Sequence, residues 1–379
     1  MPLPVSALDR QQRLTIAAAA ALTAAAGLMA GTGSPDVARF AVAAVALAAL
    51  AVLVGEAIEQ IGEYLGPGPT GLLQSSLGNL PELLVAIFAL RKGLTTVVQA
   101  ALVGSVLGNV LLVLGAAFLS GGARHGAQRF RPEAPRMLVT LLALAVGATL
   151  IPTLAVRLET PAVHHAAALS DVAAIVLLAV YVASIPFWLS GGPEMSGPPR
   201  PAPVARGGVR ARQARERSST TGLGRAQWPL GLAIGLLAGA AVASGLVSDW
   251  FVAALTPATR SLGISPMFTG LVIVALASNA VENAAGIRFA WKARPDFAIS
   301  TILNSPLQIT LLLTPVLVLI SPLLGPAHLP LVFPPLLVVA LAVAVAVVAI
   351  VVYDGEYSWL EGVALIALYV IVAAALWWG

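Results

Sequence analysis

Long apolar runs, eleven of them and each of about twenty residues or more, constrain this chain more than any other feature of its sequence. A helix needs about 20 apolar residues to cross a bilayer, whereas membrane β-barrels show shorter alternating segments. Only 10% of the residues are charged, against about 25% in soluble domains. The sequence therefore predicts an all-α polytopic membrane protein with about 11 transmembrane helices. The predicted spans are residues 12–31, 38–62, 70–90, 94–119, 135–155, 169–190, 228–253, 266–290, 297–321, 329–352 and 358–378.

The first run has two interpretations. It follows Arg10 and Arg13 and ends in small residues, a pattern that a secretory signal peptide also shows. Its apolar stretch is nearer a full span than the short core of a signal peptide. We therefore interpret residues 1–36 as an N-terminal transmembrane helix.

Arginine and lysine are distributed unevenly over the connections between spans. Sixteen fall on one side and five on the other when alternate connections are counted. By the positive-inside rule, the N-terminus lies in the cytoplasm and the C-terminus outside. The expected location is a bacterial inner membrane, and the bilayer, not nucleic acid, is the expected partner. All seven tryptophans lie near span ends, where they are predicted to anchor in the membrane interface: Trp188, Trp228, Trp250, Trp291, Trp359, Trp377 and Trp378.

One segment interrupts the apolar pattern. Residues 191–226 are dense in Gly, Pro and Arg and show no apolar periodicity, which predicts a flexible cytoplasmic linker. Contact of its arginines with anionic lipid is the alternative role. The linker separates a first group of five helices, residues 37–190, from a second, residues 227–379.

The two groups repeat each other. Residues 76–87, SLGNLPELLVAI, match residues 276–287, LASNAVENAAGI, and residues 104–115, GSVLGNVLLVLG, lie opposite residues 304–315, NSPLQITLLLTP. Both matches have an offset of 200 residues. Because five is an odd number, the second copy enters the membrane upside down. This predicts two five-helix inverted-topology repeats, a plan that places substrate sites near the midplane between the repeats.

The repeated letters are polar ones that are unusual inside a membrane helix. A glutamate in mid-span costs roughly 2.5–3.5 kcal/mol on the insertion scale, so Glu82 and Glu282 need a reason to be there. Amides and hydroxyls accompany them, with no cysteine in the chain and no histidine in these motifs. Such a set of oxygen donors favours Ca2+ or a similar hard cation. The polar set comprises Asn79 and Glu82, Ser105 and Asn109, Asn279 and Glu282, and Ser305 and Gln308.

Other functions are compatible with parts of this pattern. The glutamates could be protonated and serve only to tie helices together. A passive channel could use the same oxygens. An enzyme is not expected, because no HExxH or GxSxG motif occurs, and no cofactor is expected either.

Three further acids lie on one face of the second span, toward its cytoplasmic end. Glu56, Glu59 and Glu63 are spaced i, i+3 and i+7. They could form a vestibule that attracts Ca2+ or protons, or simply mark an interfacial helix end. Glu56 and Glu59 are the deeper pair and are the candidates for the ion pathway.

At this point the residues resemble a known family. GNLPELLVAIFALRKGL, followed by VVQAALVGSVLGNVLLVLG, is similar to the first signature of the Ca2+/H+ (cation/proton) antiporters of the cation/Ca2+ exchanger superfamily. The resemblance covers residues 38–378. It implies one N-terminal helix, two five-helix inverted repeats, and Ca2+ export driven by proton influx. It also implies a Ca2+ site between Glu82 and Glu282 with Asn79 and Asn279 beside them, and an ion path along Ser105, Asn109, Ser305 and Gln308.

The second signature departs from the family pattern. The family usually reads GNAAEH and GSSxQI, whereas this chain reads SNAVEN and NSPLQI. The largest change places Asn283 where the family has a histidine. If that histidine assists proton binding, either the carboxylates alone carry the protons here or the coupling ion has changed. Na+/Ca2+ exchange, or exchange coupled to another monovalent ion, is therefore the alternative function.

Overall fold

The computed structural model describes residues 8–65, 70, 73–74, 76–189, 228–325 and 328–378, without the side chains of residues 187–189, 281 and 282. The linker predicted over residues 191–226 lies outside the described residues. In the first half the helices are α1 (Arg10–Ala30), α2 (Asp36–Leu65), α4 (Leu80–Arg91), α5 (Thr95–Leu107), the π-helical η2 (Gly108–Val113), α6 (Leu114–His125), α7 (Glu133–Arg157), the 3-10 turn η3 (Pro161–His165) and α8 (Ala166–Leu189). In the second half they are α10 (Leu230–Leu262), α11 (Pro266–Phe268), the π-helical η4 (Thr269–Val274), α12 (Ala275–Ser278), α13 (Ala280–Trp291), α14 (Pro295–Gln308), the π-helical η5 (Ile309–Leu313), α15 (Thr314–Leu324), α16 (Pro335–Val351) and α17 (Trp359–Trp377).

Helix boundaries recur at the offset that the sequence motifs show. Helix α4 and helix α13 start 200 residues apart, as do α5 and α14 and also α6 and α15. The turn after the first pair repeats as well, because Gly93 and Ala293 both have positive φ, +71° and +54°. A left-handed backbone is costly for alanine, so its retention indicates a turn that the fold requires. The repeat is thus present in the backbone as well as in the letters.

The expected count of eleven spans is not confirmed. Among the described residues, eight helices are long and apolar enough to cross a membrane, or nine if one bent pair is counted as a single span. That pair, Pro266–Ser278 and Asn283–Trp291, is bent by 65°. Helix α16 is apolar but has only 17 residues. The predicted span over residues 70–90 lies partly outside the described residues. The hydropathy of the sequence does not reveal this bend, because a bent helix keeps its apolar composition.

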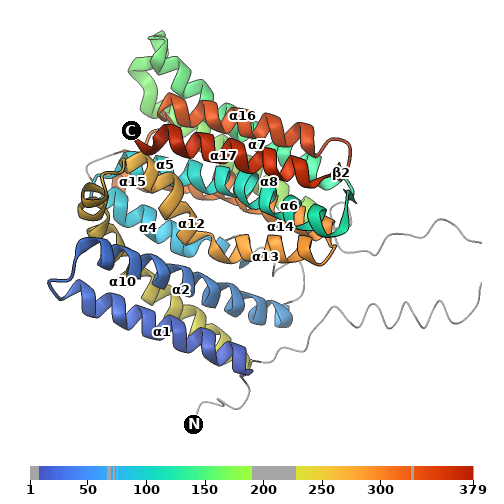
Figure 1. Ribbon diagram of the computed structural model, residues 1–379. Coiled ribbons are helices and arrows are strands. Elements are labelled where there is room, and N and C mark those ends of the chain that lie inside the picture. The colour runs from blue at the N-terminus through green and yellow to red at the C-terminus, as the bar shows by residue number, and fades with distance from the viewer. Residues whose placement is uncertain are drawn as a thin grey trace, which may run out of the picture.

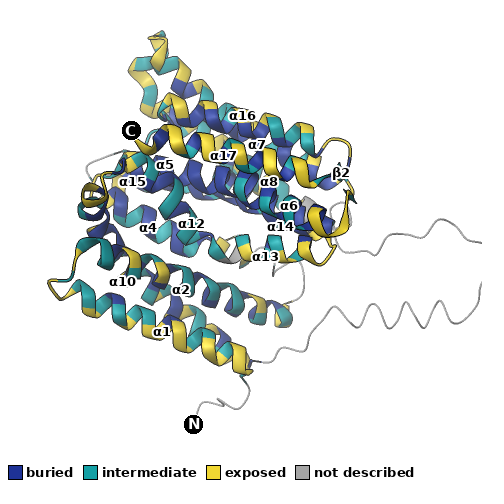
Figure 2. Cartoon of the chain, viewed as in Figure 1, coloured by how far each residue is buried: buried dark blue, intermediate teal, exposed yellow. Residues whose placement is uncertain are grey.

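The helices form layers. In Figure 1, α1, α2 and α10 lie side by side as one layer, with the remaining helices stacked beyond it. Figure 2 shows the most buried surfaces along the central helices, whereas α1 is largely exposed and buries only Ala19 and Ala26. An exposed apolar helix such as α1 suits a lipid environment. We refer to α1, α2 and α10 together as the three-helix layer.

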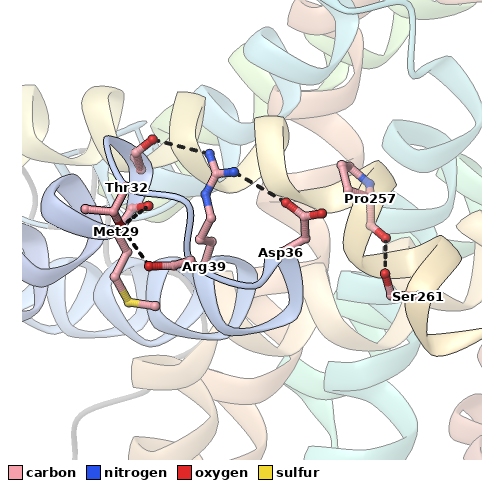
Figure 3. Close-up of polar contacts among 8 residues, drawn as sticks. Met29, Thr32, Asp36, Arg39, Pro257 and Ser261 are labelled. Atoms are coloured by element: carbon pink, nitrogen blue, oxygen red, sulfur yellow. Dashed lines mark hydrogen bonds and ion pairs between the residues drawn. The ribbon is translucent and has the colours of Figure 1, made fainter.

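Both ends of the three-helix layer are held by polar contacts. At one end, in the turn between α1 and α2, Arg39 forms an ion pair with Asp36 at 3.3 Å and donates to the carbonyl of Ala30 (Figure 3). At the other end the indole of Trp228 is fully buried, and its Nε1 donates to Oε1 of Gln12 at 2.9 Å. The prediction that Trp228 anchors in the membrane interface is therefore wrong. Its neighbours in the fold, not its place at a span end, decide its burial.

Inside the remaining bundle, two helices cross at very close range. A Cβ atom at Gly104 of α5 would lie 2.2 Å from the carbonyl oxygen of Leu271 in η4. One at Gly270 would lie 2.6 Å from the carbonyl oxygen of Val97. Only glycine permits such an approach between backbones. The crossing brings α5 of the first repeat against the segment that leads to α13 of the second.

The backbone N–H and C=O groups of irregular segments at the two ends of the bundle find hydrogen-bond partners in different ways. Strands β1 (Gln128–Arg129) and β2 (Glu356–Tyr357) pair antiparallel, with Arg129 opposite Glu356. At the opposite end, residues 328–334 run without regular structure, and side chains bind their backbone groups. These bonds are Gln99 to the carbonyls of Pro330 and Val332, and the amides of Leu329, Leu331 and Phe333 to Ser321, Ser170 and Thr153.

Ion pairs and polar contacts between connections also respect the predicted sides. Each joins residues at connections or span ends that the predicted alternation of spans places on the same side. On the face predicted to be cytoplasmic these are Arg129 with Glu356 and the amide of Arg131 with Asp296, and on the other face Lys92 with Asp249 and His328 with Asp171. The fold is thus consistent with the alternation of spans on which the orientation rests.

Candidate ion-binding site

Two helix breaks position the most unusual residues of the sequence. Helices α4 and α13 begin directly after Asn79 and Asn279, whose φ values of −91° and −103° are similar. The two asparagines therefore lie at corresponding helix starts, one in each repeat. Glu82 follows in the first turn of α4 and is only 4% exposed. A helix N-terminus carries partial positive charge, which stabilises a carboxylate at that place.

The next helix of each repeat loosens into a π-helical turn beside its polar residues. Helix α5 carries Ser105 and passes into η2, which contains Asn109. Helix α14 carries Ser305 and Gln308 and passes into η5. All four side chains are buried, at 1% to 5% exposure. Short π-helical turns frequently mark functional sites, and here they recur in both repeats.

Hydrogen bonds join these residues across the two repeats. The hydroxyl of Ser105 donates to Oε1 of Glu82 in a short contact within the first repeat. Nδ2 of Asn279, from the second repeat, donates to the same hydroxyl oxygen at 2.9 Å. Ser105 therefore connects the buried carboxylate to the opposite repeat.

A second bond crosses in the reverse direction. Nδ2 of Asn79 in the first repeat donates to Oε1 of Gln308 in the second at 3.1 Å. Asn109 donates to the backbone carbonyl of Ser105 at 2.8 Å. Its Oδ1 atom is buried and has no hydrogen-bond donor among the described residues. We refer to Asn79, Glu82, Ser105, Asn109, Asn279, Ser305 and Gln308 as the central polar cluster.

The chemistry of the central polar cluster is that of oxygen ligands. Among the described residues, no group of three or more His, Cys, Asp or Glu side chains comes together. A divalent cation here would therefore depend on hydroxyl, amide and carbonyl oxygens in addition to Glu82. Ca2+ accepts such mixed sets of six to eight oxygens, whereas zinc prefers nitrogen and sulfur.

Helix α13 carries two further residues of the second signature, Glu282 and Asn283. Glu282 lies in α13, but its side chain lies outside the described part of the structure, so its distance from Glu82 stays a prediction. Asn283, the residue that replaces the family histidine, has a buried Oδ1 with no donor among the described residues. It offers an oxygen, but it cannot bind a proton at neutral pH.

The two acids of the second span lie apart from this network. The hydroxyl of Thr15 in α1 donates to Oε1 of Glu56 at 3.3 Å, and Glu59 is exposed. Neither carboxylate is hydrogen-bonded to a described residue of the central polar cluster. The sequence gives no signal for the contact of Thr15 with Glu56 or of Trp228 with Gln12, because nothing in a run of alanines and leucines marks which polar residue meets a neighbour.

A known protein family matches both repeats of the chain. A profile of the family described as "Sodium/calcium exchanger protein" matches residues 36–189 and 232–378. A Ca2+/H+ antiporter of Synechocystis sp. is 35% identical over 339 residues, covering 89% of this chain and 90% of the relative. The Ca2+/H+ antiporter ChaA of Bacillus subtilis is 33% identical and covers 89% and 92% of the two chains.

Solved structures show the same fold. The structure titled "Structure of native YfkE" has a TM-score of 0.76 and 31% identity, and the match covers 96% of this chain and 98% of the other. The crystal structure of the H+/Ca2+ exchanger CAX has a TM-score of 0.71 at 17% identity, over 97% and 92% of the two chains. The second match supports the arrangement of helices only.

Proposed function

The chain belongs to the sodium/calcium exchanger protein family, and we propose that it exports Ca2+ in exchange for protons, with Glu82 and Glu282 as the principal ligands. Relatives named as Ca2+/H+ antiporters, which match nearly the whole chain, support the choice of ions. As a member of a family of transporters, the chain is expected to move ions and not to catalyse a chemical reaction.

One observation carries this proposal. Glu82 is buried at the interface between the repeats, and Ser105 connects it to Asn279 of the opposite repeat. A buried carboxylate needs a cation or a proton to offset its charge. Movement between the repeats would change the distance between Asn279 and Ser105, and so the environment of the carboxylate.

This arrangement explains why exchange would be obligatory. With both glutamates ionised and no cation bound, two negative charges would share a poorly hydrated site, which is unfavourable. The site is therefore expected to cross the membrane loaded with Ca2+ or with protons, but not as an empty dianion. Rocking of α4, α5, α13 and α14 against the other helices would expose it to each side in turn.

The coupling ion is the main alternative. Because Asn283 replaces a titratable residue of the family, a Na+-coupled exchange at the same oxygens is the second candidate. The test is Ca2+ uptake into inverted membrane vesicles under an imposed pH gradient, a Na+ gradient, or neither. Uptake that needs the pH gradient supports the proposal. Uptake that follows only the Na+ gradient contradicts it, and flux that needs neither indicates a channel.

Sidedness is part of the proposal, and the chain is well suited to its test because it has no cysteine. We propose that the N-terminus is cytoplasmic, that the C-terminus is outside, and that the membrane is the bacterial inner membrane. Lys92→Cys should react with a membrane-impermeant thiol reagent from outside, whereas Glu133→Cys should react only after the cells are opened. The reverse pattern would overturn the orientation.

A further inference from the structure

Helix α1 belongs to neither repeat, and the family match begins after it, at residue 36. The structure nevertheless attaches both ends of α1 to residues 228–262, the segment that contains α10. Near its start, Gln12 accepts from the indole of Trp228 at 2.9 Å. Near its end, Gly27 lies against Trp250, whose ring would be 2.8 Å from a Cβ atom at that glycine. Two tryptophans of the second repeat therefore fix the position of α1.

Trp228 also fixes α2, which makes it the centre of a clamp. Its backbone amide donates to Oε1 of Gln60 at 3.1 Å, and its carbonyl accepts from the hydroxyl of Tyr64 at 2.6 Å. The side chain is fully buried. A buried indole N–H without an acceptor would be costly, so the bond to Gln12 fixes the register of α1 along α2. We refer to Gln12, Gln60, Tyr64 and Trp228 as the tryptophan clamp.

One helical turn from the clamp, α1 meets a carboxylate. Thr15 lies three residues after Gln12, and Glu56 four residues before Gln60, so each pair shares a helix face. The hydroxyl of Thr15 donates to Oε1 of Glu56 at 3.3 Å. Oε2 of Glu56 is buried and has no hydrogen-bond donor among the described residues. The tryptophan clamp therefore holds α1 in the position along α2 at which the Thr15 hydroxyl reaches the Glu56 carboxylate.

Among the described residues, little countercharge surrounds Glu56. On its own helix, Glu59 is exposed, and Glu63 lies a further turn away. The arginines of α1, Arg10 and Arg13, are exposed. Helix α10 has no charged residue before Asp249, and α12 has none. Of the other helices packed on α2, α4 carries Glu82, which is bonded to Ser105, and Arg91 at its far end. Helix α13 carries the exposed Arg288, and also Glu282, whose side chain is not described.

The number of oxygens selects the ligand. Ca2+ requires six to eight oxygens, and the described contacts of Glu56 supply only its own carboxylate and one hydroxyl. A proton requires a single oxygen. We propose that Glu56 is a second proton-binding group, on the cytoplasmic side of the α1–α2 interface. We further propose that Trp228 is its positioning residue, which acts by holding Thr15 in place. This inference rests on the proposed exchange of Ca2+ for protons.

The direction of the effect follows from the hydrogen bond. A donor to an ionised carboxylate stabilises the charged form, so removing the hydroxyl makes the proton bind more tightly. In Thr15→Val the pH at which Ca2+ uptake is half-maximal should rise by about one unit, the size expected for one bond to a charged group. Thr15→Ser should restore the wild-type value. Thr23→Val is the matched control, because the hydroxyl of Thr23 on the same helix has no partner among the described residues.

The role of the carboxylate is tested by combining variants. In a Glu56→Gln background, Thr15→Val should cause no further shift of the pH midpoint, since the titrating group is gone. If the shift persists in that background, or if Glu56→Gln alone keeps the wild-type pH profile, Glu56 does not bind the proton.

Trp228→Phe keeps most of the ring and removes the indole N–H. It should raise the pH midpoint in the same direction as Thr15→Val, and the double variant should shift no further than Thr15→Val alone. Trp359→Phe, at an exposed tryptophan, is the control. A merely structural role for Trp228 would lower thermal stability and leave the midpoint unchanged, which would overturn the positioning role.

Failure of the proposed function gives a different result. Wild-type uptake that follows only a Na+ gradient would contradict proton exchange. The midpoint comparison between Thr15→Val and its double variant with Glu56→Gln would still decide whether the α1–α2 interface binds a proton.

Discussion

In the first repeat, a carboxylate is bonded within its own repeat, from Ser105 to Glu82; in the second, Asn279 at the corresponding helix start bonds across the interface to Ser105. Gln308 likewise accepts from the other repeat, through Asn79. The asparagines at the two corresponding helix starts thus bond across the interface to different residue types, Asn79 to an amide and Asn279 to a hydroxyl. Ser105 carries two of the contacts, to Glu82 and from Asn279, and we refer to it as the hub serine.

The backbones differ at the same place. Position 106 is valine in α5, whereas its counterpart in α14 is Pro306. Proline lacks an N–H, so the carbonyl four residues earlier, that of Ile302, loses its helical donor. The carbonyl of Pro306 accepts from the hydroxyl of Thr310 at 2.8 Å. The second repeat therefore has a carbonyl without its usual helical donor, that of Ile302, where the first repeat has a valine with an N–H.

The largest effect is expected from removing the charge of Glu82, the carboxylate bonded to the hub serine. Glu82→Gln should reduce Ca2+ uptake to background, because the amide keeps the shape but no longer offsets the desolvation of Ca2+. Thermal stability should be retained, since a neutral side chain is cheaper in the membrane. Glu282→Gln should behave alike if the two halves are equivalent in charge. Glu133→Gln, at an exposed position, is the control, and near wild-type uptake by either site variant would exclude the proposed ligands.

The hub itself should be next in size. Ser105→Ala removes a donor to the carboxylate and an acceptor for Asn279, and a bond to a charged group is worth about 1.5–3 kcal/mol. We expect apparent Ca2+ affinity to fall about ten- to hundredfold, and Ser305→Ala provides the matched measurement in the other repeat. Ser120→Ala, where the hydroxyl bonds only its own helix, is the control. Wild-type affinity in Ser105→Ala would contradict this role, and equal losses at both central serines would mean that the two repeats are functionally symmetric.

A double-mutant cycle can measure the weaker crossing bond. Asn79→Ala and Gln308→Ala each remove one partner of a neutral hydrogen bond, so the coupling between them should be about 0.5–1.5 kcal/mol in Ca2+ binding. The same cycle on Ser105 and Asn279 should give the larger coupling, because Ser105 also donates to the Glu82 carboxylate. A coupling near zero for both pairs would separate the observed contacts from ion binding.

The smallest expected effect concerns the family histidine. Asn283→His introduces a group with an unperturbed pKa of about 6.5 beside Glu282. As pH falls through that value, the added positive charge should weaken Ca2+ binding. Relative to the wild type, the variant should therefore lose apparent Ca2+ affinity below about pH 6.5, with little change above it. Ca2+ uptake measured against pH for both proteins tests this, and identical profiles would mean that position 283 lies away from the ion.

Much of the fold could be predicted from polar letters in apolar helices. Asn79 and Glu82 recur as Asn279 and Glu282. Because polar residues are costly in a membrane, their recurrence indicates a repeat from the sequence alone. The pairing could not be predicted in this way. Asn79 meets Gln308, not its own counterpart Asn279, because the inverted packing of α5 against η4 sets the neighbours.

Burial of single side chains was equally hidden. Trp228 and the exposed Trp359 both lie at the start of a long apolar helix, and hydropathy treats them alike. The difference comes from Gln12 and Gln60, which are 216 and 168 residues away in sequence. Local composition does not encode which distant amide a side chain will meet.

The crossing bonds have a consequence for biosynthesis. Asn279 follows its partner Ser105 by 174 residues. At about 5–20 residues per second, a ribosome needs roughly 10–35 seconds to supply it. During that interval the nascent first repeat must keep its carboxylate in the bilayer with the hub serine only half satisfied. Assembly of the protein is therefore expected to be sensitive to the speed of translation between the two motifs, and so to codon choice over the segment that joins them.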